Sequence, residues 1–498
     1  MAALKRTYFL IKMFNINTKS FNFEKKKNFL FVVLGFCIFF ISENNGMFWD
    51  NVLFASKMGN HLFYNSIFEW TIPNEFDPGH PPFLGFLLAV FWKIFGHKLW
   101  VSHLLMLPFT IGVFYQLFKF VTYFIEQKQR QIFAFSLLII DPTLSTQFVI
   151  VNPEVIIIFF FFLTINGILF RNKRLKFIGL FFLSIISFRS MMLLGGILIF
   201  DILNKYLLNK KSLKSILNFK FILSYILNSL PGIIFVSWRL CTKGWLQTHP
   251  DSPWVSLWKI ATPKIFLKNF ATLTHRFVDY GRFFLLLFLI ISLFLFGKKI
   301  ITSKKNRQLL LISFSTIIFI VIAVLISTNS FGHRYFIVSF CSLNLLVFVI
   351  INNYFFKKKT IYTLLFLGLV TGNFWIYPKE ISQGWDATLA HIPYHQLRIH
   401  AIKYLNTNNI NIDEVASFFP NCTSLDLVDF KGDKRSFSKF NNKNKYVFYS
   451  NVYNLTDEEY YDLDKNYSSL KKFTKHNITI NILIKNDFIR RKKNSSRY

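Results

Sequence analysis

The sequence predicts a polytopic α-helical membrane protein with a small soluble α/β domain after its last membrane-spanning helix. The 498-residue chain is 53% hydrophobic and contains 65 phenylalanines, which is too apolar a composition for a soluble protein of this size. Its apolar residues form long continuous blocks, not amphipathic stripes, and the blocks end near residue 377. Blocks of about 20 apolar residues are long enough to cross the hydrocarbon core of a bilayer.

The formal net charge of +33 could indicate a nucleic-acid-binding protein, but the distribution of charge does not. The lysines lie in short clusters between apolar blocks, which is the pattern of loops held at an anionic cytoplasmic membrane surface. We therefore expect membrane lipids as partners and no nucleic acid. Two of the four cysteines lie inside apolar runs, so neither a disulfide framework nor a cysteine-bound metal is predicted.

The N-terminal segment, residues 1–27, is basic and precedes the first apolar block, residues 29–41. A cleaved signal peptide is the competing interpretation, but no small-residue cleavage site follows the block. We predict that the N-terminus is cytoplasmic and that the first block is an uncleaved span.

Further apolar segments bring the predicted number of spans to about eleven. These segments are residues 99–122, 131–149, 153–170, 175–188, 190–207, 218–240, 283–297, 308–327, 335–353 and 360–377. The segment 82–95 is also apolar, but it is short and opens with two prolines, so we predict a juxtamembrane or re-entrant helix there. With that segment outside, lysine and arginine concentrate in the inward-facing loops, as the positive-inside rule requires.

This topology puts residues 43–97 in the first outer loop of a transmembrane domain that covers residues 28–377, and it puts the C-terminus outside. Residues 378–498 turn polar and predict an extracytoplasmic soluble α/β domain, large enough to hold its own core. The elements predicted in this domain are strands at 445–449 and 478–484 and helices at 395–405 and 457–470.

Ionisable residues near a bilayer are costly, so their positions are informative. Most of them fall at the predicted outer ends of the helices, where they could converge on one cavity. These residues are Asp50, Asp77, His80, Asp141, Glu154, Arg189, Arg239, His333 and Arg334.

The candidates in the first outer loop also have ordinary structural interpretations. Asp50 follows the first span and either caps a helix or acts as a catalytic carboxylate. Asp77 and His80 lie in a turn rich in proline and glycine, where aspartate is a common turn former. With a third ligand the two could hold a divalent metal ion, although their spacing matches no recognised ligand pattern.

Two later candidates lie at predicted helix starts. Glu154, after Pro153, either interacts favourably with the helix dipole or contacts a substrate. Arg334 is unfavourable for the dipole at such a position, so it indicates an anionic partner. A phosphate group is the natural partner for a bidentate guanidinium, and contact with a lipid headgroup is the alternative.

Taken in order, these motifs resemble those of the GT-C superfamily of membrane glycosyltransferases, in the branch of protein O-mannosyltransferases and the aminoarabinose transferase of lipid A (glycosyltransferase family 39-like). That branch has an aspartate after the first span, a glycine in the next short helix, and a His- or Lys-Pro-Pro-Leu motif that opens a juxtamembrane helix ending in Phe-Gly. The similar residues in this chain are Asp50, Gly59, His80, Pro81, Pro82, Phe83, Phe95 and Gly96, followed by Pro153 with Glu154 and by Arg334 with Tyr335. The chain departs from the pattern at Asn51 and His103.

The resemblance implies transfer of a hexosyl or pentosyl group from a polyprenyl-phosphate donor to a hydroxyl of a lipid, polysaccharide or protein, at the outer face of a bacterial plasma membrane. It implies that Asp50 is the general base of an inverting displacement and that Arg334 stabilises the leaving phosphate. The residues expected to bind substrate with Arg334 are Glu154, Tyr335, His80 and Asp77. The sequence identifies no cofactor, and a divalent metal ion stays an option.

Two other classes of protein compete with this interpretation. A multi-span secondary transporter usually carries polar groups near the membrane midplane on interrupted, repeated helices, whereas here the charges favour one face and no repeat is evident. A non-enzymatic envelope assembly protein is the other alternative, and it leaves the loop around Asp50 without a purpose.

Overall fold

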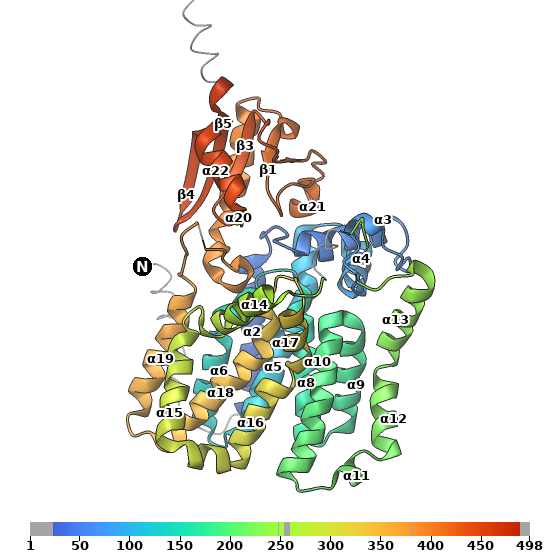
Figure 1. The fold of residues 1–498 in the computed structure, drawn as a ribbon, viewed down its shortest axis with the longest axis vertical. Coiled ribbons are helices and arrows are strands. Elements are labelled where there is room, and N and C mark those ends of the chain that lie inside the picture. Colours follow the sequence, from blue (N-terminus) through green and yellow to red (C-terminus); the bar gives the residue numbers. More distant parts are fainter. Residues whose placement is uncertain (1–22, 248, 253–258, 380, 489–498) are drawn as a thin grey trace, which may run out of the picture.

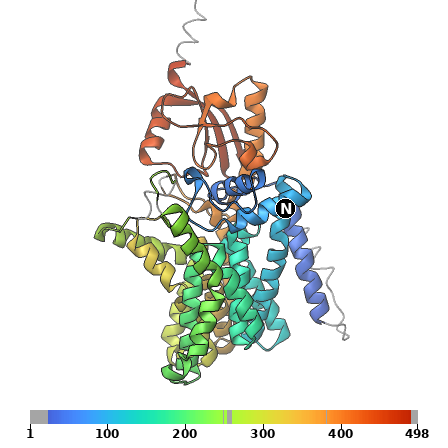
Figure 2. The same cartoon turned by 90° about the vertical axis from the view of Figure 1, so that its right-hand side faces the viewer.

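The computed structural model describes residues 23–247, 249–252, 259–379 and 381–488. They form three layers: a helical bundle, a layer of short helices across one end of it, and an α/β domain above that layer (Figure 1). The same stacking is seen after a quarter turn (Figure 2). Most of the predicted cytoplasmic segment 1–27 lies outside the described residues.

The helical bundle is built from the segments that the hydropathy pattern identifies. Its helices are α2 (Phe23–Ser42), α5 (Leu99–Phe124), α6 (Lys128–Ile139), α8 (Pro153–Leu169), α9 (Lys173–Ile186), α10 (Phe188–Leu203), α12 (Phe219–Asn228), α13 (Leu230–Lys243), α15 (Arg282–Thr302), α16 (Lys304–Ser315), α17 (Ile318–Ile326), α18 (Ile337–Tyr354) and α19 (Lys358–Gly372). Short segments extend it at η3 (Asn204–Leu208) and α11 (Leu213–Ile216). Each predicted span therefore contains a helix, although 131–149, 218–240 and 308–327 are each divided between two.

The predicted count of about eleven spans is not confirmed. In the described part of the chain, five stretches are long and apolar enough to cross a membrane, namely Leu99–Phe124, Phe188–Leu208, Arg282–Thr302, Lys304–Ile326 and His333–Tyr354. The pair α12 and α13, bent by 59°, would make a sixth. The other predicted segments are helical without reaching this combination of length and apolarity. These apolar helices identify an integral membrane protein.

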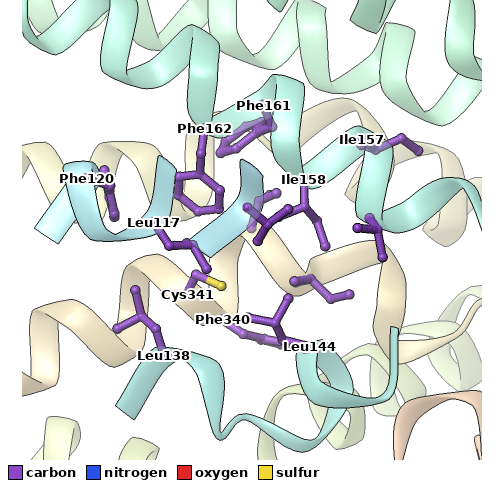
Figure 3. Close-up of a cluster of buried hydrophobic side chains, with 14 of the residues drawn as sticks. Leu117, Phe120, Leu138, Leu144, Ile157, Ile158, Phe161, Phe162, Phe340 and Cys341 are labelled. Carbon is purple, nitrogen blue, oxygen red and sulfur yellow. The ribbon is translucent and has the colours of Figure 1, made fainter. Parts of the chain in front are cut away.

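The centre of the bundle is an apolar core formed by α5, α6, α8 and α18 (Figure 3). Nearly every residue of α18 is buried, among them Phe340 and Cys341, which explains why this helix is apolar all round. Phe161 and Phe162 of α8 and Leu117 of α5 are fully buried in the same cluster. The ends of these helices are therefore held in fixed relative positions, which matters for the site described below.

The middle layer lies at one end of the bundle and contains the first predicted outer loop. Its short helices are η1 (Val52–Lys57), α3 (Met58–Tyr64), η2 (Asn74–Phe76), α4 (Phe83–Phe95), α7 (Pro142–Gln147), α14 (Pro263–Val278) and η4 (His333–Phe336). Helix α4 packs against α3 at the glycines Gly59 and Gly85, where a Cβ would collide with the neighbouring helix. The predicted short apolar helix after the two prolines is thus a packed element of this layer (Figure 1).

The C-terminal domain is a five-stranded mixed sheet with the order β2-β1-β3-β5-β4. Its elements are η5 (Trp385–Ala387), η6 (Leu389–His391), α20 (Pro393–Thr407), η7 (Ile412–Glu414), β1 (Val415–Ser417), α21 (Asp426–Asp429), β2 (Ser438–Lys439), β3 (Tyr446–Ser450), α22 (Asp457–Asn466), β4 (Tyr467–Lys475) and β5 (Ile478–Lys485). Strand β1 is parallel to β2 and β3, and β5 is antiparallel to β3 and β4.

The secondary structure predicted in this domain is confirmed except at one boundary. Both predicted strands and the helix at 395–405 are present, but the helix predicted over 457–470 ends at Asn466. Residues 467–470 begin β4 instead, because β4 and β5 form a hairpin whose two turn residues, His476 and Asn477, both have positive φ. Pairing with β5 overrides the helical pattern that continues past residue 466.

The C-terminal domain docks on the segment predicted as the first outer loop, residues 43–97. Phe48 is 1% exposed and belongs to the apolar core of the domain, where its ring stacks on His391 with centroids 4.5 Å apart. The N–H of Met47 donates to the carbonyl of Val428 at 2.9 Å. The loop that carries Asp50 and the C-terminal domain therefore lie at the same end of the bundle (Figure 1).

Candidate active site

A cavity opens where α8 and α10 begin and at η4, just before α18, between α17 and the predicted first outer loop. Its empty volume is about 1210 Å³, with the open solvent at its mouth included. Polar and charged side chains on its lining include Asp50, His80, Glu154, Arg189, Arg334 and Tyr335. Five of the six site residues predicted from the sequence thus meet in one cavity, and Asp77 is the exception.

Asp50 is held at the cavity by its neighbours on both sides. Trp49, which precedes it, adopts the left-handed conformation at φ 52° and contacts Phe419 of the C-terminal domain with ring centroids 5.9 Å apart. After it, the Asp50 carbonyl accepts from the N–H groups of Leu53 and Phe54 at 3.0 and 2.8 Å as η1 begins. The Asp50 carboxylate does not cap that helix. It pairs with Arg334 and stays 29% exposed, so it is available to a substrate.

Glu154 is free to interact with other side chains because Asn152 caps α8. The Asn152 side chain accepts from the N–H groups of Glu154 and Val155 at 2.7 and 3.3 Å. The Glu154 carboxylate pairs with Arg189, and its oxygen lies 3.7 Å from Nε of Arg334. Glu154 therefore joins the two arginines of the cavity.

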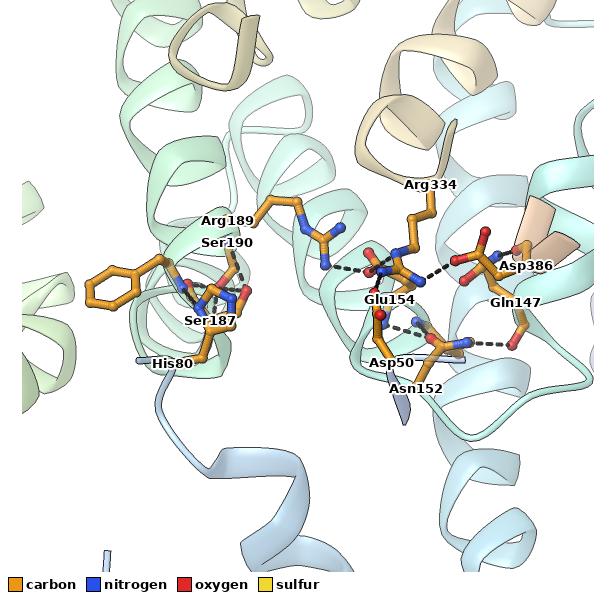
Figure 4. A network of polar contacts seen from close by, with 12 residues as sticks. Asp50, His80, Gln147, Asn152, Glu154, Ser187, Arg189, Ser190, Arg334 and Asp386 are labelled. Carbon is orange, nitrogen blue, oxygen red and sulfur yellow. Dashed lines mark hydrogen bonds and ion pairs between the residues drawn. The ribbon is translucent and has the colours of Figure 1, made fainter. Parts of the chain in front are cut away.

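Arg334 is surrounded by three carboxylates that come from distant parts of the chain (Figure 4). Its Nη2 donates to Asp50 and its Nη1 donates to Asp386, while Glu154 faces its Nε. Asp386 lies in η5, beyond the last helix of the bundle. The Arg334 side chain is 11% exposed, and this arrangement fixes the plane of its guanidinium.

Arg189 is the second guanidinium of the cavity and has fewer partners. It donates to Glu154 through Nη2, and its guanidinium carbon lies 4.2 Å from the centre of the Tyr335 ring. Its Nε and Nη1 have no hydrogen-bond partner among the described residues. Both nitrogens are buried, so they are unsatisfied donors that an anionic ligand in the cavity could pair with.

His80 lies on the side of the cavity near the start of α10. Its Nδ1 accepts from the N–H of Phe188 at 3.3 Å, so Nε2 carries the proton of the neutral ring. Burial, assisted by the nearby charges of Arg189 and Arg239, lowers the pKa of His80 to about 3. A neutral His80 can donate one hydrogen bond from Nε2 but carries no positive charge at neutral pH.

Asp77, predicted as a substrate-binding residue, does not line the cavity. Its side chain is fully buried, and Oδ2 lies 3.1 Å from Nη2 of Arg239 and 2.9 Å from Nζ of Lys243. Its Oδ1 accepts from the N–H of Gly79 at 2.8 Å. Two cations thus neutralise this carboxylate, and it fixes the turn before α4. Asp77 and His80 do not belong to the group of described residues whose ligand atoms lie close enough to hold a metal ion.

The group that could hold a metal ion in the described part of the chain is formed by His275, Asp279 and His333, whose ligand atoms all lie within 4.8 Å of one another. In the observed arrangement His333 Nε2 lies 2.7 Å from Oδ2 of Asp279, and the hydroxyl of Tyr377 donates to the other oxygen. Burial opposes the ionised carboxyl, yet these hydrogen bonds hold the pKa of Asp279 at about 2. The carboxylate is thus satisfied by the protein itself.

The remaining outer-end charges pair outside the cavity. Asp141 lies 2.9 Å from Nη1 of Arg282, and both side chains are buried. Asp141 also caps α7, since its side chain accepts from the N–H of Thr143 at 3.0 Å. These contacts account for the position of Asp141, so a substrate-binding role is not needed to explain it.

Two residues of the charged network around Glu154 and Arg334 are not assigned as site residues from the sequence: Arg189, which lines the cavity, and Asp386, which does not. Arg189 is recognisable as an outer-end charge, but nothing local distinguishes it from Arg239. Asp386 stands in a polar stretch after the last apolar block and has no sequence signal at all, because its contact with Arg334 joins residues 52 positions apart.

No protein-family model and no curated protein sequence matches the chain. Among solved structures, the chain is similar to ArnT from Cupriavidus metallidurans bound to undecaprenyl phosphate, at 10% sequence identity over 91% of this chain and 97% of that chain, with a TM-score of 0.49. The apo state of the same protein matches at 10% identity and the same coverage, with a TM-score of 0.46. ArnT is an aminoarabinose transferase, the kind of glycosyltransferase that the sequence motifs resemble. The likeness concerns overall architecture, and the site is interpreted below from its own residues.

Proposed function

We propose that the protein transfers a sugar from a polyprenyl-phosphate donor to the hydroxyl of an acceptor at the outer membrane face. The observation that carries this proposal is the composition of the cavity wall. One side bears the carboxylates and guanidiniums around Arg334, and another is formed by apolar residues of α17 and α10, including Ile320, Val324 and Met192. A donor with a charged phosphate and a hydrocarbon chain matches both surfaces.

The carboxylate of Asp50 is the proposed general base. It would accept the proton of the acceptor hydroxyl as that oxygen attacks the anomeric carbon. The bond between the anomeric carbon and the phosphate oxygen breaks in the same step, so the configuration inverts and the polyprenyl phosphate leaves with the bonding electrons.

The leaving phosphate would be stabilised by the two guanidiniums of the cavity. Arg189 is the more available of the two, because Asp50, Glu154 and Asp386 already surround Arg334. Preorganised cations in a site with little water stabilise developing negative charge strongly. The neutral His80 and the hydroxyl of Tyr335 are further donors on the cavity wall.

The proposal is tested with purified protein in lipid vesicles that contain a polyprenyl phosphate carrying a radiolabelled sugar. Label should move from the extractable donor to a more polar acceptor, with hexosyl and pentosyl donors and lipid, polysaccharide and peptide acceptors compared in parallel. Uptake of labelled solute into the vesicles without transfer would favour a transporter. The absence of both would favour an assembly protein.

A further inference from the structure

Asp386 belongs to the start of the C-terminal domain and contacts Arg334 without lining the cavity itself. It stands in η5, and its carboxylate pairs with Arg334 (Figure 4). Building on the proposed function, we infer that Asp386 is a positioning residue: it holds the guanidinium of Arg334 against Asp50, and through it the C-terminal domain supports sugar transfer.

The backbone around Asp386 is anchored at each neighbouring residue. Nε2 of Gln147 donates to the carbonyl of Asp386 at 2.7 Å. Trp385 is 3% exposed in the apolar core of the C-terminal domain, and Ala387 is fully buried. These contacts fix the backbone at Asp386, so its carboxylate is held in one position relative to Arg334.

The preceding residue, Gly384, brings the segment into close contact with the element that carries Arg334. The hydroxyl of Tyr280 donates to the carbonyl of Gly384 at 3.0 Å. A Cβ at Gly384 would lie 2.9 Å from Nδ1 of His333, the residue before Arg334. Gly384 thus allows the approach that places Asp386 within reach of the guanidinium.

The three carboxylates around Arg334 face different nitrogens of its guanidinium, and this arrangement defines the role of Asp386. Asp50 and Asp386 bind the two terminal nitrogens of Arg334, so together they define the plane of the guanidinium. Without Asp386, the remaining carboxylates are Asp50 and Glu154, and the guanidinium would turn toward them. Asp50 would then lose the geometry in which it meets the acceptor hydroxyl.

The C-terminal domain also contacts the segment that carries Asp50, the other partner of Arg334. Its residues Phe419 and His391 pack against Trp49 and Phe48, which directly precede Asp50. The domain therefore positions the proposed base through the first outer loop and its arginine partner through Asp386.

The test compares Asp386→Ala, Arg334→Ala and the double variant in the transfer assay. Asp386→Ala should lower kcat on the order of 10²-fold, while the KM for the donor changes less than about threefold because Asp386 holds Arg334 and not the donor. The double variant should be no slower than Arg334→Ala alone, since both changes remove one unit. Asp386→Asn, which keeps an oxygen acceptor, should retain more activity than Asp386→Ala.

The matched control is Asp464→Asn, which removes a carboxylate of the same domain that pairs with Lys379 at 2.5 Å on the exposed surface. It should leave kcat and the unfolding temperature unchanged. An unchanged kcat in Asp386→Ala, additive losses in the double variant, or tighter donor binding without loss of kcat would each overturn the inference. If the wild-type protein transfers no sugar, the proposed function itself fails, which is a different outcome.

Discussion

The ion pairs around Arg334 and those around Asp77 lie at the same end of the bundle, yet they differ in exposure. Asp77 and Arg239 are 0% and 2% exposed, and Lys243 completes a closed cluster. Around the cavity, Asp50 is 29% and Arg189 is 16% exposed, and two nitrogens of Arg189 have no partner among the described residues. A closed cluster stabilises a turn, whereas an incomplete one beside a cavity can bind and act on a ligand.

The largest difference between the two clusters should appear when their carboxylates are changed one at a time. Asp50→Asn keeps the size and polarity of the side chain but removes the basic oxygen. Loss of a positioned general base costs about 10²–10⁴-fold in rate, so sugar transfer should fall by about 10³-fold. The measurement is the initial rate in the vesicle assay at saturating donor. Near-normal turnover would remove Asp50 from the role of base.

Asp77→Ala should affect stability and not the chemical step. It leaves Arg239 buried without its carboxylate, and breaking a buried pair costs about 3 kcal/mol or more. The detergent-solubilised variant should therefore unfold at a lower denaturant concentration. Its kcat, measured at a temperature where it is folded, should stay near that of the wild type. A variant with normal stability and no activity would place Asp77 in the mechanism after all.

Arg189→Ala should act on donor binding, with a smaller effect than Asp50→Asn. A charge-assisted hydrogen bond contributes about 1.5–3 kcal/mol, so the KM for the donor should rise on the order of 10- to 100-fold. The matched variant Arg189→Lys keeps the charge but not the planar donors, so its KM for the donor should lie between those of the wild type and Arg189→Ala. An unchanged KM for the donor in Arg189→Ala would mean that Arg189 does not bind the donor phosphate and would leave Arg334 as its guanidinium partner.

The smallest expected effect concerns the pH dependence that His80 contributes. Its pKa in the folded protein is about 3, below the value of 6.5 for an unperturbed histidine. The unfolded chain therefore binds a proton that the folded protein does not, and stability falls as the pH drops below about 6.5. This loss amounts to about 2 kcal/mol at pH 5. His80→Gln, compared with wild type in unfolding experiments at pH 7.5 and 5.0, should lose less stability between the two. An equal loss would contradict a lowered pKa for His80.

The positions of the helices could be predicted because their signals are local. An apolar block predicts a helix whatever it packs against, and the predicted segments do fold as helices. The predicted number of spans is not confirmed, because some helices, such as α8, are shorter than a membrane-spanning helix requires. The hairpin that replaces the end of the helix predicted at 457–470 likewise depends on pairing with β5.

The sequence by itself determined that this is a membrane protein whose charged residues gather at the helix ends, because burial in lipid excludes charge from the apolar blocks. It did not determine which charges pair. Asp77 and Arg239 are 162 positions apart, and Asp50 and Arg334 are 284 positions apart. Only the packing of the bundle decides that the first pair is closed and that the second lines a cavity. Only the docking of the C-terminal domain brings Asp386 to Arg334. The residues around a carboxylate in a polar stretch do not indicate which distant side chain it will contact.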